Sequence, residues 1–569
     1  MKPHNQCVKP NTVSEDMQTL NTPLKRTTVA VWLFTQLLAT GSAHADERES
    51  LEQLRATTTN LIELLVQEGV LSKQKADTLL QKAAADAKAS QQASQQAELH
   101  DDVKNEVNKA MDEKTVRVQY IPQHVKQAMR EEIEHDVMEK LNYKAGERLG
   151  VPEWIDRISF HGDIRLRGQA DEFPGDNDDF VTLNNDLRRS MNLENSSEER
   201  RRARIRARLA ADMRINDWLT GGLQLVTGVQ NTPVTPNQTE GIAQGKYQFT
   251  LDRAFLQAKP AEWATVTGGR FANPFMYTDM LWDPDLAFDG FTATFTPKIN
   301  DRLTSFTTVG AFPIEEVESS SVNKARDKWL YSLQTGIKWT APNKSSVKVA
   351  AAYHDFKNVE GQLNTVGLND YSGTAPEWRQ RGNNTFDINA NNLGTPGQGS
   401  IIGLASKFEL INLMAQVDLM NFDPVHVTFT GDYVRNIGFD QNEVLQRTGN
   451  LYKKENEGYN VRIDVGNNSF LGPYVQNVNA HEWQVSLGYK YLEADAVMDG
   501  FTDSNFRLGG TNAKGWYMYA NYAVDKNAWI SARYMSADSI SGPLDPITGS
   551  SQQQNFSVDV LLIDLNARF

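Results

Sequence analysis

The pattern of hydrophobic and polar positions changes once along the chain. From Asp46 to about Lys140, leucines and alanines recur at helical spacing in a stretch rich in Ala, Gln, Glu and Lys. After Trp154, apolar residues alternate with polar ones, and the runs are separated by Asn, Asp, Gly and Pro. The pattern predicts a helical or coiled-coil segment over 46–150 and a strand-rich region over 157–569.

The strand-rich region divides into about sixteen predicted strands joined by connections of alternating length. Connections after odd-numbered strands are long, whereas those after even-numbered strands are mostly two to four residues, with 467–479 as the exception. A transmembrane barrel has short periplasmic turns and long external loops, and about 9–11 tilted residues cross the membrane. We therefore expect an all-β transmembrane antiparallel β-barrel with an N-terminal periplasmic helical segment; an exported β-sandwich or β-helix is the alternative. The predicted strands are 157–169, 199–213, 217–230, 247–259, 262–271, 289–297, 302–311, 328–340, 345–355, 403–421, 425–437, 457–466, 480–495, 514–523, 527–538 and 556–569.

The N-terminus indicates export. The apolar stretch Thr27–Thr40 follows Lys25-Arg26 and precedes Ala43-His44-Ala45, which is typical of a signal peptide spanning 1–45. The single cysteine, Cys7, would leave with it, which excludes disulfide scaffolds, thiol catalysis and cysteine-ligated metals. The net charge of -14 over 569 residues also disfavours nucleic acid as a partner.

The last predicted strand ends on an aromatic residue. Leu561, Ile563 and Leu565 share a face with Phe569, the final residue. A terminal Phe on an alternating strand looks like the signal read by the outer-membrane barrel assembly machinery. We therefore expect Phe569 to be an assembly signal, with outer-membrane lipids and lipopolysaccharide surrounding the folded barrel.

Several sequence blocks carry a resemblance to a known family. The blocks are Val116–Pro122, Gly162–Arg167, Gly269–Phe275, Leu281–Leu286, Ala494–Val497, Phe501–Asn505 and Gly509–Thr511. In these blocks, and in its order of segments, the chain resembles the "putative porin" family of Gram-negative outer-membrane proteins. The resemblance implies passive diffusion of small hydrophilic solutes through a water-filled channel, and it implies no cofactor.

A row of arginines lies on one face of the second predicted strand. Facing lipid, each arginine near the midplane would cost about 2–4 kcal/mol, so the row is expected to line the lumen beside the arginines of the first strand. The alternative is that lumenal carboxylates neutralise these arginines, which then only brace the wall. The predicted pore-lining residues are Arg165, Arg167, Arg202, Arg204, Arg206 and Arg208.

Four aspartates follow the fifth predicted strand among large apolar residues. In sixteen-stranded porins the third external loop folds into the barrel and narrows it, and this connection resembles that loop by position. An acidic loop opposite a basic wall would create a transverse field. A loop packed on the rim is one alternative, and a Ca²⁺ site on Asp283 and Asp285 is another. The constriction candidates are Asp279, Asp283, Asp285 and Asp289.

The sequence offers no constellation for catalysis. The glycine-rich Gly509–Gly515 lacks P-loop spacing, and no zinc-protease or nucleophile-elbow motif occurs. We therefore expect a non-enzymatic porin without a metal. The alternative is a structural anchor whose segment 46–150 binds peptidoglycan or oligomerises, and whether the barrel forms a homotrimer stays open.

Overall fold

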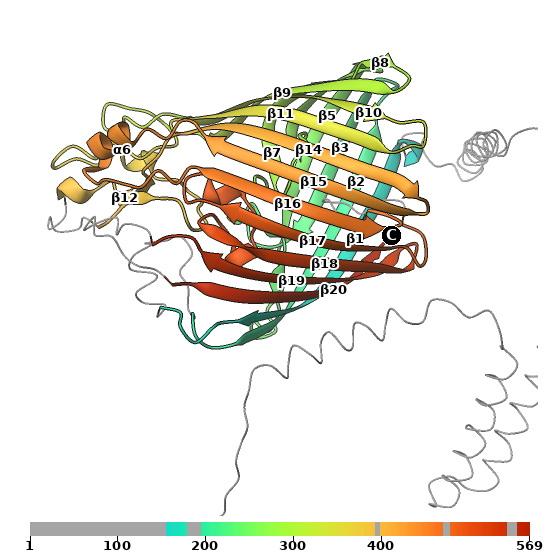
Figure 1. Cartoon of the computed structure of the whole chain (residues 1–569). Helices are drawn as coiled ribbons and strands as arrows, with labels where there is room; N and C mark the ends of the chain where they lie inside the picture. The colour runs from blue at the N-terminus through green and yellow to red at the C-terminus, as the bar shows by residue number, and fades with distance from the viewer. Residues whose placement is uncertain (1–154, 179–194, 393–398, 470–477, 543–554) are drawn as a thin grey trace, which may run out of the picture. The chain divides into compact units, whose positions relative to one another are not determined.

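The computed structural model describes residues 155–178, 195–392, 399–469, 478–542 and 555–569 (Figure 1). The predicted signal peptide and the predicted helical segment 46–150 lie outside these residues. In the described part, no helix combines the length and the apolar character needed to cross a bilayer.

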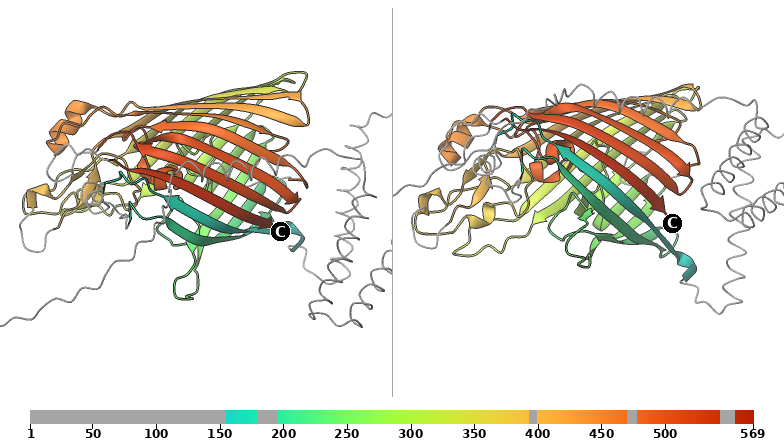
Figure 2. Two further views of the ribbon diagram at one scale, coloured as in Figure 1. Left: turned by 60° about the horizontal axis from the view of Figure 1, so that its bottom comes forward. Right: turned by 90° about the horizontal axis from the view of Figure 1, so that it is seen from below.

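A closed antiparallel β-barrel forms the body of the described chain. Its sheet contains eighteen strands, of which β4 and β8 are short additions, and the remaining sixteen form the barrel wall. The barrel closes where β1 pairs with β20, and Figure 2 shows these first and last strands side by side. The wall strands are β1 (Ile158–Glu172), β2 (Arg200–Arg214), β3 (Leu219–Thr227), β5 (Phe249–Ala261), β6 (Ala264–Ala272), β7 (Ala287–Phe295), β9 (Leu303–Glu315), β10 (Lys328–Thr340), β11 (Ser346–Lys357), β14 (Phe408–Phe422), β15 (Val425–Asn436), β16 (Glu457–Gly466), β17 (Trp483–Leu492), β18 (Ala513–Asp525), β19 (Ala528–Ser539) and β20 (Ser557–Arg568).

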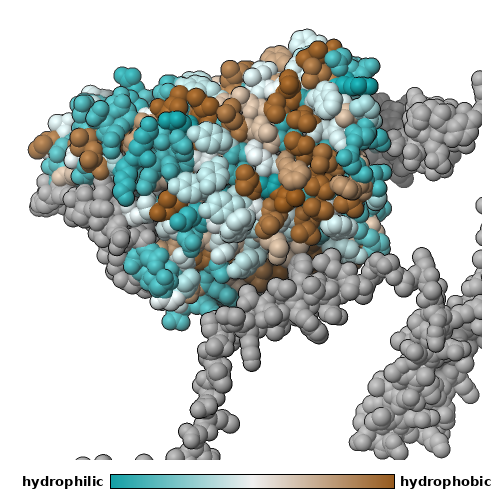
Figure 3. Space-filling view, viewed as in Figure 1, coloured by the Kyte–Doolittle hydropathy of each residue, from teal (hydrophilic) through white to brown (hydrophobic). Residues whose placement is uncertain are grey.

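The period-two pattern explains the two faces of the wall. On β1, Ile164 and Leu166 are 44% and 47% exposed, whereas the neighbouring Arg165 and Arg167 are buried on the inner face. Leu561, Ile563 and Leu565 repeat this outward alternation on β20. In the space-filling view, apolar side chains gather over the strands and the loop end is mostly hydrophilic (Figure 3). The outer surface is thus the lipid-facing one.

Each of the sixteen predicted strands overlaps one barrel strand, which confirms the predicted fold class. The pattern missed short elements outside the barrel wall, and the predicted strand 403–421 began too early because Leu404 is part of β13. Of these elements, β4 and β8 extend the wall strands β2 and β9, whereas β12, β13 and α6 depend on contacts between loops, where Phe386, Ile388 and Val444 form a separate small core. The missed elements are β4 (Gln238–Thr239), β8 (Lys298–Asn300), β12 (Thr385–Asp387), β13 (Ile402–Leu404) and α6 (Gln441–Thr448).

Three external loops are joined by hydrogen bonds. The Asp283 amide donates to the Phe501 carbonyl at 2.7 Å, which links loop 273–286 to loop 493–512. The Thr511 amide donates to the Arg381 carbonyl at 2.7 Å, which links loop 493–512 to loop 358–407. The loops therefore form one interlocked layer at the external end of the barrel.

The interlocked layer should loosen as the pH rises. Asp495 is fully buried and accepts hydrogen bonds from the backbone and side-chain amides of Asn384 at 3.0 and 2.8 Å. Burial raises the pKa of Asp495 to about 7, so the packed loop holds a proton that a solvated carboxyl would release. Packing is therefore favoured at low pH and weakens as the pH rises from about 4 to 7. The hydrogen-exchange protection factors of loops 358–407 and 493–512, which are corrected for the intrinsic effect of pH on exchange, should fall over this window in the parent protein and change less in Asp495→Asn. Identical dependence of the protection factors on pH in the two proteins would contradict the assignment.

Candidate functional site

Loop 273–286 is anchored inside the barrel by a large apolar core. Phe275, Met280, Leu281 and Trp282 are buried among inward-facing side chains of the wall, including Phe312. The Met276 amide also donates to the side chain of Gln334 on β10 at 2.7 Å. The apolar side chains of the loop therefore fill part of the barrel interior on this side.

The opposite wall carries the arginine row. Arg206 and Arg208 donate to Asp163 at 2.7 and 2.6 Å, all within the β1–β2 pair. Arg167 binds Asp564 of β20 through two nitrogens at 2.6 and 2.7 Å, a bidentate geometry. Farther toward the external end, Arg202 and Arg204 are half-buried on the same face, and Arg202 lies 3.1 Å from Asp171.

Asp285 joins the inward-folded loop to this wall. Its carboxylate lies 3.4 Å from Arg206, 3.9 Å from Arg208 and 4.0 Å from Arg165. Burial alone would raise the pKa of Asp285, but these guanidinium groups outweigh burial and hold its pKa below the ordinary value. Asp285 is therefore the carboxylate by which the loop touches the basic wall.

The other aspartates of the loop face a different set of partners. Asp279 lies 3.0 Å from Lys490 of β17 and accepts a hydrogen bond from Tyr519 at 3.3 Å. Asp283 accepts from the Ser504 amide at 3.0 Å and from the Asp285 amide at 2.8 Å. Burial, together with Asp285 and Asp503, raises the pKa of Asp283 well above its ordinary value. This part of the loop is thus tied to loop 493–512 and β17.

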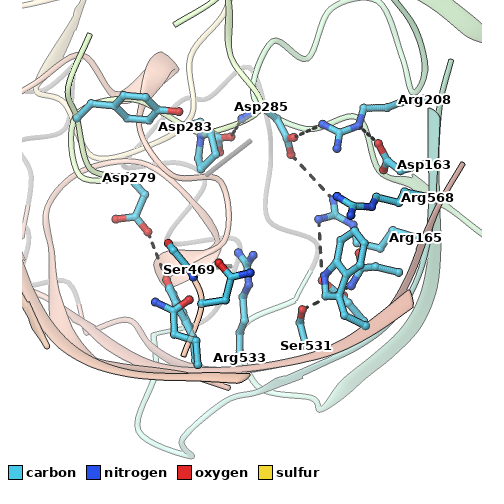
Figure 4. Close-up of a pocket in the computed structure, with 18 of the residues that line it drawn as sticks. Asp163, Arg165, Arg208, Asp279, Asp283, Asp285, Ser469, Ser531, Arg533 and Arg568 are labelled. Carbon is cyan, nitrogen blue, oxygen red and sulfur yellow. Dashed lines mark hydrogen bonds and ion pairs between the residues drawn. The ribbon is translucent and has the colours of Figure 1, made fainter. Parts of the chain in front are cut away.

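The two groups of charges border one lumenal cavity of about 1040 Å³. In Figure 4, Asp279 and Asp283 lie on one side of the opening, and Arg165, Arg208 and Arg568 lie on the other. Four of the six predicted arginines, Arg165, Arg167, Arg206 and Arg208, line this cavity together with Arg568 and the carboxylates Asp163, Asp285 and Asp564. The other two, Arg202 and Arg204, share the inner face but do not border the cavity. The cavity is therefore bordered by arginines of β1 and β2 on one side and by the loop aspartates Asp279 and Asp283 on the other, and Arg462 and Arg533 also line it.

One of the predicted constriction residues lies elsewhere. Asp289 is on β7, on the same strand face as Phe291, which is 70% exposed, and it pairs with Arg270 at 2.6 Å. Its placement corrects the expectation that it belongs to the inward-folded loop. The reason is that Asp289 belongs to strand β7 (Ala287–Phe295), where strand parity places its side chain on the outward face with Phe291.

Sequence reasoning raised lumenal carboxylates as partners of the arginines but did not say which residues they are. Asp163 and Asp171 share the inner face of β1 with Arg165, a signal that strand parity alone could have shown. Asp564 becomes a partner of Arg167 through the β1–β20 register, which one strand alone does not reveal. Among the described residues, no group of three or more His, Cys, Asp or Glu is arranged to hold a metal ion.

The fold and the charged lumen define an outer-membrane channel of the porin class. The chain belongs to the family described as "Putative porin", whose model matches residues 55–569. No curated protein matches the chain. Among solved structures, OprB of Pseudomonas putida is 10% identical to this chain with a TM-score of 0.40, and the alignment covers 74% of this chain and 97% of the OprB chain. OmpF of Salmonella typhi in complex with daunomycin is 12% identical with a TM-score of 0.35, and the alignment covers 72% of this chain and 97% of the OmpF chain. The outer-membrane channel DcaP of Acinetobacter baumannii is 10% identical with a TM-score of 0.36, and the alignment covers 72% of this chain and 97% of the DcaP chain.

Proposed function

We propose that the barrel is a passive, non-enzymatic diffusion channel for small hydrophilic solutes or ions. The observation that carries the proposal is the lumenal cavity, which charged and polar side chains of opposite walls border on both sides. Such a lumen filters solutes by cross-section and by their orientation in the transverse field. Loop 273–286 and the apolar core around it narrow the path through the barrel, and the arginine row borders the space that stays open.

The proposed partners of the barrel lie in the outer membrane and in the periplasm. Phe569 is the assembly signal for the outer-membrane machinery, and the predicted segment 46–150 lies in the periplasm, where peptidoglycan is its candidate partner. Association into a homotrimer is the candidate assembly. A protein that only anchors the cell wall would fold into the same barrel without conducting.

Reconstitution tests the channel directly. Purified barrels in planar bilayers should give stepwise current increases that are ohmic at low voltage, because a water-filled lumen needs no energy input. Preparations lacking residues 46–150 should conduct equally well, since the residues that border the lumen in the described part of the chain belong to the barrel and its loops. Folded barrels that insert without any current would instead support the anchoring function, which a peptidoglycan binding assay of the full chain would then examine.

A further inference from the structure

A second cavity lies at the external rim of the barrel, on the other side of loop 273–286 from the lumen. Its volume is about 170 Å³, and aromatic side chains dominate its wall: Trp282, Phe288, Phe312, Trp378 and Phe501. An apolar cavity of about 150 Å³ in a protein core is large enough to bind benzene. The rim cavity therefore has the size for one aromatic ring.

The rings of the wall are arranged to receive another ring. Trp282 and Phe288 meet edge to face with centroids 5.1 Å apart, and Phe288 meets Phe312 in the same manner at 5.0 Å. Edge-to-face contact is the preferred geometry between aromatic rings.

Four of the five charged groups around the cavity are paired with one another, and the fifth, Glu377, is exposed to solvent. Arg270 binds Asp289 at 2.6 Å, and Lys328 forms an ion pair with Glu315. A charged ligand would have to compete with these pairs and lose its hydration as well. The cavity therefore favours a neutral molecule.

The rim cavity shares a wall with the lumen. Trp282 and Leu286 line the rim cavity, whereas Asp283 and Asp285, between them in sequence, line the lumen. Loop 493–512 repeats this division, because Phe501 lines the rim cavity and Asp503 the lumen. A molecule that moves Trp282 thus acts on the segment that holds Asp285 against the arginine row.

We propose that the rim cavity binds a neutral single-ring aromatic molecule, and that its occupancy changes the current through the lumen. The proposed binding site rests only on the geometry of the cavity and does not require the channel function. The effect on current rests on the proposed channel function. Binding stabilises one position of Trp282 and thereby one distance between Asp285 and the arginines, which sets the local charge of the constriction.

Binding can be measured without any current. With 4-fluorophenol as probe, fluorine NMR of detergent-solubilised barrels should show saturable binding. Val359→Phe and Met498→Phe each add a ring at the cavity wall and should each weaken binding by at least about tenfold. Val461→Phe is the matched control, because Val461 is 52% exposed on the lipid-facing side of β16, and its binding should be unchanged. A heat-dependent change in electrophoretic mobility identifies the variants that fold. One folded variant of Val359→Phe and Met498→Phe is enough for the test.

The outcomes separate the site from the channel. Equal binding by the parent and a folded filling variant, or no saturable binding, would overturn the site. Cyclohexanol competing as well as phenol would overturn the aromatic class of the ligand. In bilayers, 4-fluorophenol should alter the current of the parent and of Val461→Phe but not that of Val359→Phe. Binding with unaltered current would overturn the coupling, whereas barrels that bind but never conduct would overturn the channel function.

Discussion

Replacing Asp285 by Asn should shift the reversal potential of reconstituted barrels strongly toward anion selectivity. Asp285 offsets Arg165, Arg206 and Arg208, so its loss makes this wall more positive by one charge. A unit charge about 6 Å from a passing monovalent ion contributes roughly 0.7 kcal/mol in water, or about a threefold change in local ion concentration. The shift should be larger at low salt, where screening is weaker.

Asp289→Asn is the matched control for this measurement. It removes the same charge from the same region of sequence, but its side chain lies on the outward face beside Arg270 and not in the lumen. Arg206→Gln should shift selectivity in the opposite direction, toward cations. Equal shifts in Asp285→Asn and Asp289→Asn, with both barrels folded, would show that the lumenal charges do not set selectivity.

The inner position of the arginine row could be predicted from the sequence because strand parity and lipid cost act on a single strand. Turning Arg204, Arg206 and Arg208 toward lipid would cost about 2–4 kcal/mol per arginine near the bilayer midplane. No partner strand is needed for this argument. The same local reasoning located all sixteen barrel strands, because alternation and turn residues are local signals.

The partners of the arginines depend on register and on loop folding, which are not local. Arg167 and Asp564 are 397 positions apart and meet only because β20 pairs with β1. Asp283 and Asp285 are two residues apart, yet one binds the Ser504 amide and the other contacts the arginines. A turn in which the Leu286 amide donates to the Asp283 carbonyl at 3.1 Å separates their directions. Such a division of neighbouring side chains requires the folded loop.

The outward position of Asp289 was nevertheless within reach of sequence reasoning. The predicted strand 289–297 already included it, and Phe291 is apolar at the same parity. Treating Asp289 as a loop residue gave more weight to its acidic neighbours than to strand alternation. Its ion pair with Arg270, at the external end of adjacent strands, explains how a charge is kept on the outer face.

The C-terminal seam of the barrel should be the most sensitive point of its assembly. Gly162 and Phe569 exchange two backbone hydrogen bonds of 3.0 Å, and the Phe569 ring covers Gly162. A Cβ added at Gly162 would lie 2.7 Å from the Phe569 ring and 2.5 Å from the Arg208 carbonyl oxygen. Gly162→Val should therefore displace the ring and destabilise the seam by about 1–3 kcal/mol or more. Gly168→Val is the matched control on the same strand, because a Cβ there meets no atom within 4 Å.

Deleting Phe569 should reduce folding in two settings for two reasons. In cells, the outer membrane should contain less heat-modifiable barrel because the proposed assembly signal is missing. In purified lipid vesicles, where no assembly machinery is present, refolding should still be impaired because the seam loses both the ring and its hydrogen bonds to Gly162. Gly162→Val should reproduce the vesicle defect while keeping the terminal Phe, and Gly168→Val should fold normally in both settings. If Phe569 deletion refolds in vesicles as well as the parent and fails only in cells, the residue acts as a signal alone and the packing at Gly162 contributes nothing to closure.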